Sequence, residues 1–362
     1  MDEHRTPDKI TQQVQKGRGT QTNRAGRFEV QISELIDDGW GQDPRAEKIR
    51  TEQLNDNSKT VIAYNSSPDI RFDRSINPYR GCEHGCSYCF ARPTHTYLGM
   101  SAGIDFETRI MVKHEVANLL SEELQQPSYN CDTIALSPNT DCYQPIEREL
   151  GLTRQVLEVL QRAEHPVTIV TKSALVRRDI DILADMASRD LANVVLSVTT
   201  FDKTLSRKLE PRASAPHRRL EAIQELRAAG IPVGVLVAPI IPFINDNEIE
   251  NILQGCRDAG AISASYVLLR LPHEVRDLWL EWLDTHYPER KERVMKAIRA
   301  SRGGKDYDAT FRTRMTGTGE FADLIAQRFK LARKKFGFQS SLDDLNRTRF
   351  NPSALSNQMS LF

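Results

Sequence analysis

The chain has 362 residues, of which 39% are hydrophobic and 27% are charged. This length can hold one α/β barrel of about 200 to 250 residues with extensions, or two smaller domains. Its 49 Lys and Arg residues balance its 49 Asp and Glu residues, which excludes binding to polyanions through overall charge. Any nucleic-acid-binding surface must therefore be local.

The chain shows no segment typical of a membrane protein or a secreted protein. The most apolar run, 231–244, is too short to span a bilayer and contains three prolines. The N-terminal residues lack the apolar stretch of a secretion signal. We therefore expect no membrane association and a cytoplasmic location, where thiols stay reduced and clustered cysteines indicate a metal site before a disulfide.

Four regions follow one another along the chain. Residues 1–60 are polar with little periodicity, which is typical of a flexible extension. Residues 61–287 have the pattern of a core domain. Residues 288–345 are charged and helical, and residues 346–362 lose that periodicity and indicate a flexible tail.

The core region alternates short β-rich runs with amphipathic helical segments. The helix over 152–163 has one apolar face, and a second helix is expected between Ser214 as N-cap and Gly230 as stop. Six strands that alternate with helices predict an α/β fold with a parallel sheet covered on both faces, either doubly wound or an open, partial (β/α) barrel. Functional residues should then lie at the carboxyl ends of the strands. The expected strands are 76–81, 133–137, 167–173, 193–200, 233–240 and 264–271.

Three of the six cysteines, Cys82, Cys86 and Cys89, lie within eight residues. Their soft thiolates can hold an iron–sulfur cluster or zinc. A structural zinc site needs a fourth ligand, for which His84 and His95 are the nearby candidates. Cys131 and Cys256 are interpreted as buried structural thiols.

The segment CEHGCSYC, with Tyr88 before the last cysteine, resembles the signature of the radical S-adenosylmethionine (SAM) superfamily. The resemblance implies a partial (β/α)6 barrel in which the three thiolates hold a 4Fe–4S cluster, and Tyr88 belongs to the cofactor site. The resemblance also implies that the iron without a cysteine ligand binds SAM and that an external electron donor supplies the electron that cleaves SAM to a 5′-deoxyadenosyl radical.

Two further segments, SPNTDCYQP at 137–145 and IVTKS at 169–173, resemble the spore photoproduct lyase-like branch, also described as DNA repair photolyase-like. The likeness covers about residues 70–275. It implies that Thr140 and Asp141 hold the amino group of SAM, that Lys172 pairs with its carboxylate, and that Ser197 binds its methionyl or ribose oxygens. From the residues alone, Asp141 and Lys172 could instead form a salt bridge, and Ser197 could bond to the backbone.

Two positions depart from the lyase pattern. The redox-active tyrosine after the third cluster cysteine is replaced by Phe90, and the cysteine hydrogen donor by Pro138. Cys142 could act as the hydrogen donor instead, or it could be a small apolar residue in a turn. We therefore expect a radical reaction related to lesion cleavage rather than that reaction itself.

Basic residues gather at several places, including 207–219 after the fourth expected strand. They could hold a nucleic-acid backbone of DNA or RNA, or they could be solvated helix faces. The C-terminal residues Gln358, Met359, Leu361 and Phe362 resemble the pentapeptide that docks on the bacterial DNA sliding clamp, since a polar tail presents an aliphatic and aromatic anchor.

Three functional hypotheses result. The first is a radical SAM enzyme that acts on nucleic acid, with lyase chemistry in DNA repair. The second keeps the radical chemistry but directs it at tRNA or protein. The third is a non-catalytic metal-binding module that docks on the replication clamp.

Overall fold

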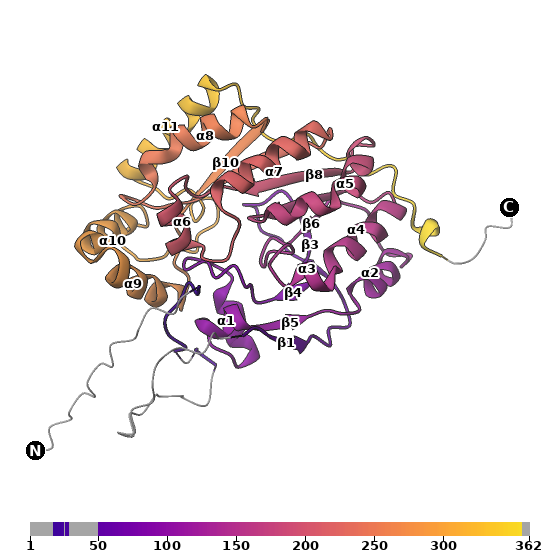
Figure 1. Ribbon diagram of the computed structural model, residues 1–362, viewed down its shortest axis with the longest axis horizontal. Helices are drawn as coiled ribbons and strands as arrows, with labels where there is room; N and C mark the ends of the chain where they lie inside the picture. The colour runs from indigo at the N-terminus through magenta and orange to yellow at the C-terminus, as the bar shows by residue number, and fades with distance from the viewer. Residues whose placement is uncertain (1–16, 25, 29–49, 357–362) are drawn as a thin grey trace, which may run out of the picture.

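The computed structural model describes residues 17–24, 26–28 and 50–356. Its centre is a seven-stranded sheet in the order β10-β9-β8-β7-β6-β3-β2 (Figure 1). Neighbouring strands from β3 to β10 pair in parallel, and β2 pairs antiparallel with β3. The predicted parallel sheet is therefore confirmed, and the described sheet stays open. The strands are β2 (Ile62–Tyr64), β3 (Arg74–Ile76), β6 (Ile134–Leu136), β7 (Val167–Thr171), β8 (Ala192–Ser197), β9 (Val233–Ile240) and β10 (Ser263–Leu268).

One expected strand, 76–81, is wrong in its extent. The chain leaves β3 at Ile76, and Asn77 and Pro78 separate it from β4 (Tyr79–Arg80). β4 belongs to a second sheet of order β1-β5-β4, with β1 at Glu52–Asn55 and β5 at Arg109–Val112. Proline has no N–H to donate to a strand ladder, so the run cannot continue as one strand. The break directs the chain away from the main sheet and into the cysteine segment.

Helices cover one face of the main sheet in a row (Figure 1). The predicted apolar face of α4 is buried along its length, because Leu152, Val156 and Leu160 are all at most 3% exposed. The row consists of α2 (Val116–Leu124), α4 (Leu152–Arg162), α5 (Ile180–Ala187), α7 (Pro216–Ala228), α8 (Ile249–Asp258) and α11 (Glu320–Lys335). The short helices α1 (Ile104–Thr108), α3 (Glu147–Leu150) and α6 (Lys203–Leu209) lie outside this row.

The expected N-cap of α7 is also wrong. Ala215 is the N-cap residue, and no side chain caps this helix end. The Ser214 hydroxyl instead accepts a hydrogen bond from the Ala174 N–H at 2.8 Å. Pro216 at the first helical position already lacks an N–H, so one capping partner fewer is needed. The expected stop is confirmed, since α7 ends at Ala228 and Gly230 adopts a φ of +82°.

A second apolar cluster joins the C-terminal helices to the cysteine segment. It contains Cys86 and Tyr88 together with residues of α9 (Val275–His286) and α10 (Lys291–Ala300). Trp279 and Trp282 stack with ring centroids 4.7 Å apart. Large aromatic rings bury much apolar area, so these helices contribute to the packing around the cysteine segment.

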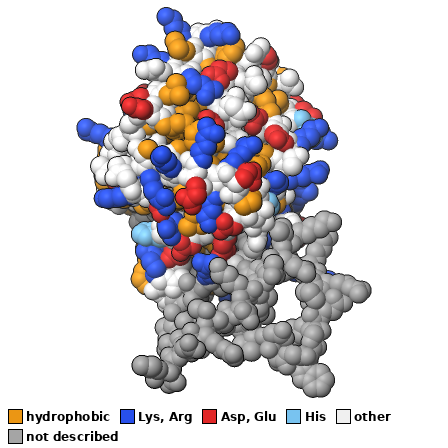
Figure 2. All heavy atoms as spheres, turned by 90° about the vertical axis from the view of Figure 1, so that its left-hand side faces the viewer, with side chains coloured by type: hydrophobic (Ala, Val, Ile, Leu, Met, Phe, Trp, Pro, Cys, Tyr) orange, Lys and Arg blue, Asp and Glu red, His pale blue; other side chains and the backbone are white. Residues whose placement is uncertain are grey.

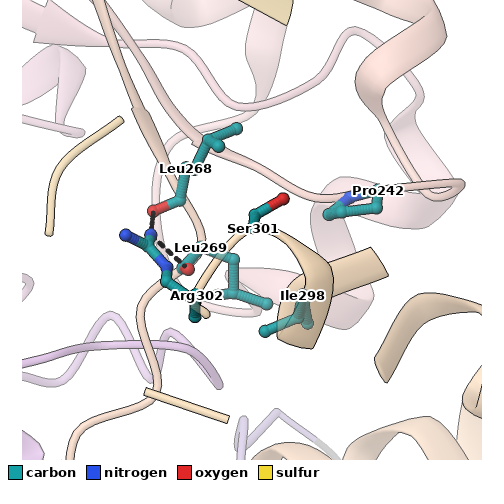
Figure 3. Close-up of a pocket in the computed structure, with 6 residues that line it drawn as sticks. All are labelled: Pro242, Leu268, Leu269, Ile298, Ser301 and Arg302. Carbon is teal, nitrogen blue, oxygen red and sulfur yellow. Dashed lines mark hydrogen bonds between the residues drawn. The ribbon is translucent and has the colours of Figure 1, made fainter. Parts of the chain in front are cut away.

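The chain after α10 is fixed by the buried Arg302, which donates to the Leu269 carbonyl at 3.1 Å (Figure 3). The same side chain donates to the Thr313 and Arg314 carbonyls at 3.0 and 2.8 Å. A cavity of about 10 Å³ remains between Arg302, Ile298 and Pro242. It has room for at most about one water molecule, so this part of the structure is packing rather than a binding site.

The molecular surface near α9, α10 and α11 mixes charges of both signs. Figure 2 shows Lys and Arg side chains interspersed with Asp, Glu and hydrophobic side chains on this face. The basic run at 333–335 lies in the last turn of α11, where cations interact favourably with the helix dipole. No described helix is both long enough and apolar enough to cross a membrane.

The described part of the C-terminal segment, residues 346–356, runs along the amino-terminal edge of the main sheet. Backbone N–H groups of Asn346 and Asn351 each donate to a carbonyl of the core at 2.8 Å. The Phe350 ring packs against His165, with ring centroids 5.1 Å apart. The residues of the expected clamp motif, 358–362, lie outside the described residues.

His165 lies beneath this segment, with 0% of its surface exposed. Its Nδ1 lies 3.0 Å from the Pro166 carbonyl and its Nε2 lies 2.7 Å from the Tyr129 hydroxyl. These partners suit a neutral imidazole with one donor and one acceptor. Burial is the main cause that lowers the pKa of His165 to about 4.

We expect protonation of His165 to destabilise the fold in mild acid. The unfolded chain binds this proton near pH 6.5 and the folded chain near pH 4. The contribution of the neutral His165 ring to the free energy of unfolding is therefore complete above pH 6.5 and is lost as the pH falls towards 4. It amounts to about 3 kcal/mol. An NMR titration assigned with His165→Gln should show the ring unprotonated at pH 5.5. An ordinary pKa near 6.5 would contradict this expectation.

Candidate functional site

The three clustered cysteines lie in one loop between β4 and the 3₁₀ helix Arg92–Leu98. Cys82 and Cys86 are buried, and Cys89 is partly buried. The loop is folded on itself, because the Gly85 N–H donates to the Cys82 carbonyl and the Cys89 N–H to the Cys86 carbonyl, at 3.4 and 3.3 Å. Gly85 has a φ of +66°, which a residue with a side chain rarely adopts. The local sequence thus brings three thiols of one short loop together.

Arg92 fixes this loop from within. Its side chain is 0% exposed and donates to the carbonyls of Cys86, Ala102 and Gly103 at 2.9 to 3.0 Å. It also forms an ion pair of 2.5 Å with Glu107, whose side chain is equally buried. A buried guanidinium is tolerated only when its donors are used, and here backbone carbonyls supply three of the acceptors, one in the loop at Cys86 and two just before α1 at Ala102 and Gly103.

Glu107 extends the same contact to the N-terminal segment 17–24. Its carboxylate accepts hydrogen bonds from the Gly19 and Thr20 N–H groups at 2.9 and 3.0 Å. A Cβ atom at Gly19 would lie 1.6 Å from the Gly85 carbonyl oxygen, so the two backbones are in direct contact. Part of the polar N-terminal region is thus packed over the cysteine loop, a contact that the sequence did not predict.

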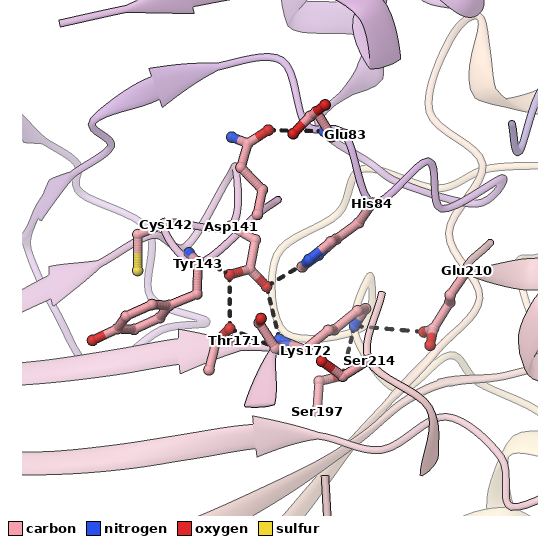
Figure 4. A network of polar contacts seen from close by, with 12 residues as sticks. Glu83, His84, Asp141, Cys142, Tyr143, Thr171, Lys172, Ser197, Glu210 and Ser214 are labelled. Carbon is pink, nitrogen blue, oxygen red and sulfur yellow. Dashed lines mark hydrogen bonds and ion pairs between the residues drawn. The ribbon is translucent and has the colours of Figure 1, made fainter. Parts of the chain in front are cut away.

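A polar network lies below the loop, at the carboxyl ends of β7 and β8 (Figure 4). The Lys172 ammonium donates to the Ser197 hydroxyl at 2.6 Å and lies 3.9 Å from Glu210. The same ammonium is 5.9 Å from the centre of the Tyr88 ring. Three of the predicted site residues, Tyr88, Lys172 and Ser197, are therefore brought together.

Glu210 is the central acceptor of this network, and sequence reasoning missed it. Its carboxylate accepts hydrogen bonds from Tyr88, from Thr199 at 2.6 Å and from the buried Arg219. Burial alone would raise the pKa of Glu210, but Arg219 and Lys172 outweigh that effect and lower it to about 2. Its position just after α6 carries no motif, so only the fold could reveal it.

Asp141 forms a second network that joins the β6 end to the cysteine loop. Its carboxylate accepts hydrogen bonds from the Lys172 N–H and the Thr171 hydroxyl, both at 2.7 Å, and lies 3.4 Å from His84 Nδ1. Burial alone would raise its pKa, but His84 and these donors lower the pKa of Asp141 to about 2. Asp141 thus contacts the Lys172 backbone, and the Lys172 ammonium points to Ser197.

Two other predicted site residues lie apart from these networks. The Thr140 hydroxyl donates to the Tyr79 carbonyl at 2.6 Å, which uses its proton within the backbone. Cys142 is 0% exposed and belongs to the main apolar core. Figure 4 shows its sulfur directed away from Lys172 and Ser197. Its role as a hydrogen donor stays a prediction.

Glu83, which lies between the first two cysteines, also links the loop to the rest of the structure, and sequence reasoning missed it as well. Glu83 accepts hydrogen bonds from Thr51 and from the Ile146 N–H, the latter at 2.6 Å, and lies 3.0 Å from Arg212. Its own N–H donates to the Gln144 side chain at 2.8 Å. The start of the loop is therefore anchored to the segment that follows β6.

The donor set fits an iron–sulfur cluster, because three cysteine thiolates are soft ligands for iron. In the described part of the chain, no three His, Cys, Asp or Glu side chains are gathered closely enough to hold a single metal ion. In a four-iron cluster each thiolate binds a different iron, so the ligands stand further apart than around one ion. Burial raises the pKa of all three thiols, and a bound metal centre would supply the positive charge that stabilises their thiolates.

A family model for the radical SAM superfamily matches residues 76–255. An uncharacterized protein of Mycobacterium tuberculosis is 37% identical over 232 residues, which cover 64% of this chain and 68% of that protein. An uncharacterized protein of Methanocaldococcus jannaschii is 30% identical over 174 residues, 48% of this chain and 62% of that protein. The chain therefore belongs to the radical SAM superfamily, as the cysteine signature predicted. Membership implies SAM and a 4Fe–4S cluster as cofactors.

The fold is similar to that of spore photoproduct lyase complexed with dinucleoside spore photoproduct. The TM-score is 0.57 at 16% identity, over 79% of this chain and 80% of that chain. At this identity the similarity concerns the fold. The resemblance to the spore photoproduct lyase-like branch is thus confirmed for the architecture.

We expect Gly19→Ala to detach segment 17–24 from the cysteine loop, because the added methyl group would meet the backbone of Gly85. Limited trypsin digestion, followed by mass spectrometry, should show faster cleavage after Arg18 and Arg24. Gln21→Ala is the matched control, since it removes only an exposed hydrogen bond to Thr285 in the same segment. Equal cleavage rates for the two variants would show that the contact between the glycines does not hold the segment.

Proposed function

We propose that this chain is a radical SAM enzyme in which Cys82, Cys86 and Cys89 hold the 4Fe–4S cluster and nucleic acid is the substrate. The observation that carries the proposal is the position of the three thiols. They lie in one loop that packs above Lys172 and Ser197 at the ends of adjacent parallel strands. Ligands of open α/β sheets bind at this edge.

When bound together, the cluster and SAM supply reductive cleavage of the sulfonium and the 5′-deoxyadenosyl radical, with the electron coming from an external donor. The residues of the chain position SAM. The Lys172 ammonium offers a cation for the SAM carboxylate, and Ser197, its present partner, can share that role. Asp141 holds the Lys172 backbone in place and offers a carboxylate for the amino group. Tyr88 and Glu210, both buried, keep water away from this side of Lys172.

The choice of nucleic acid and of lyase chemistry, as in DNA repair, is supported by the fold. The solved structure that this fold resembles is a spore photoproduct lyase with a dinucleoside lesion bound. At the position where the lyase pattern has a redox-active tyrosine, Phe90 has no O–H, and its ring is 44% exposed with the Arg270 guanidinium 5.4 Å from its centre. We therefore propose a reaction related to lesion cleavage that does not use this tyrosine. Clamp docking and a cytoplasmic location stay predictions.

We expect Cys82→Ser, Cys86→Ser and Cys89→Ser each to abolish cluster assembly, because a hydroxyl is a poor ligand for iron compared with a thiolate. After anaerobic reconstitution and reduction with SAM, the wild-type chain should form 5′-deoxyadenosine and the variants should not. Cys131→Ser is the matched control, since Cys131 is, contrary to expectation, only partly buried, as Cys89 is. A wild-type chain that binds zinc and forms no 5′-deoxyadenosine would exclude the radical function.

The substrate is tested separately on ultraviolet-irradiated and unirradiated DNA. If the proposal holds, irradiated DNA loses its photoproducts, or acquires a modified base, only in the presence of SAM and reductant. Mass spectrometry of the digested DNA measures both. Turnover of SAM with no change in either DNA or RNA would leave the radical chemistry intact and reject nucleic acid as the substrate.

We expect Lys172→Met to weaken SAM binding about 10- to 100-fold, because it removes a hydrogen bond between charged groups. The buried Glu210 keeps Arg219 as its partner in this variant, so the fold should persist. Equilibrium binding of SAM to the reconstituted protein measures the effect, with the exposed Lys296→Met as control. A loss no larger than in the control would mean that Lys172 only stabilises the strand ends.

A further inference from the structure

A cavity of about 110 Å³ lies beside the proposed SAM site, at the carboxyl edge of the main sheet. Its wall includes Tyr143 from the segment after β6, Arg148 on α3 and Ser173 after β7. Arg212 and Ser214, from the loop after α6, complete it together with His84 of the cysteine loop. Lys172 is not among the residues that line it, so this cavity is separate from the Lys172 and Ser197 pair.

The chemistry of the cavity wall favours an anion. Two guanidinium groups face it, and none of the described residues that line it is an Asp or Glu. The Ser173 and Ser214 hydroxyls accept hydrogen bonds from the Leu175 and Ala174 N–H groups at 3.2 and 2.8 Å. Each hydroxyl proton is left without an acceptor in the described part of the chain and can be donated to a ligand.

Arg148 is the most informative group of this cavity. It is exposed, and its guanidinium makes no hydrogen bond or ion pair within the described ranges. Nearby arginines are all engaged, since Arg178 pairs with Glu147, Arg154 with Asp181 and Arg177 with Glu225. An arginine that keeps all its donors while its neighbours are paired is available for a ligand.

Arg212 places a second cation at a fixed position. Its Nη2 atom lies 3.0 Å from Glu83, and its backbone N–H donates to the His84 carbonyl at 3.2 Å. One ion pair uses only part of the five guanidinium donors. Of the basic run expected at 207–219, Arg212 is the residue that lines the cavity, while Arg219 is buried against Glu210.

We propose that this cavity binds one phosphate group of the nucleic-acid backbone, so that Arg148 and Arg212 position the substrate beside the cofactor. A guanidinium fork matches phosphate geometry, and the volume of about 110 Å³ is several times the roughly 10 to 15 Å³ that one water molecule needs in a cavity. Only the phosphate group would lie inside, and the base would stay outside the cavity. This inference rests on the proposed function and specifies how its substrate is held.

The test uses the anaerobically reconstituted full chain and a fluorescein-labelled DNA oligonucleotide, with anisotropy measured between 50 and 200 mM salt. Arg148→Gln should weaken binding about tenfold and lower the slope of log affinity against log salt by about one. Arg162→Gln is the matched control. Arg162 is equally exposed, makes no ion pair among the described residues, and ends α4 at the opposite edge of the sheet. It should bind DNA as the wild type does.

Inorganic phosphate and SAM distinguish the other sources of an anion. If Arg148→Gln weakens SAM binding and leaves DNA binding unchanged, the cavity holds the SAM carboxylate and the inference is wrong. It is also wrong if inorganic phosphate binds tightly and Arg148→Gln abolishes that binding without changing DNA binding. The same holds if Arg148→Gln and Arg162→Gln lose the same DNA affinity.

Formation of 5′-deoxyadenosine without any DNA binding would reject this inference and keep the radical chemistry. If DNA binding depends on salt and is lost in Arg148→Gln, but SAM is not cleaved, the phosphate site stands and the radical chemistry is rejected.

Discussion

The buried ion pair between Arg92 and Glu107 is the contact on which the cysteine loop depends. Both side chains are 0% exposed, and removing two charges from water costs several kcal/mol for each ion. That cost is offset only if the remaining donors and acceptors are used. Arg92 binds three backbone carbonyls around the loop, and Glu107 binds the backbone of segment 17–24. The pair therefore fixes a loop that has little regular secondary structure of its own.

Glu210 has the corresponding function on the sheet side of the loop. It receives donors from the loop through Tyr88, from the segment after β8 through Thr199 and from α7 through Arg219. Because the Ser87 N–H also donates to the Leu209 carbonyl at 3.0 Å, the cysteine loop and the chain after α6 form one hydrogen-bonded unit. Two buried carboxylates, on opposite sides of the loop, thus hold the three thiols relative to Lys172.

The sequence predicted the parts of this arrangement that depend on local pattern. The parallel sheet and the helix faces follow from the alternation and apolar periodicity of the segments, and the superfamily follows from the resemblance of the cysteine segment to its signature. The buried carboxylates that fix the loop, Glu83 within it and Glu107 and Glu210 outside it, could not be predicted, because no local signal separates a buried carboxylate from a solvated one. The same reason applies to Gly19, whose backbone contact with Gly85 joins residues far apart in the sequence.

Charge along the sequence was equally ambiguous for the nucleic-acid surface. Arg212 and Arg219 belong to one basic run, yet the fold buries Arg219 against Glu210 and leaves Arg212 at a cavity. Arg148 belongs to no such run, and its guanidinium has no partner among the described residues although it lines the cavity. What decides whether an arginine can hold a phosphate is therefore the supply of carboxylates around it, not the density of basic residues in the sequence. A chain with balanced charge can bind a polyanion at a few such positions, since each guanidinium that neutralises a phosphate releases a counterion from the nucleic acid.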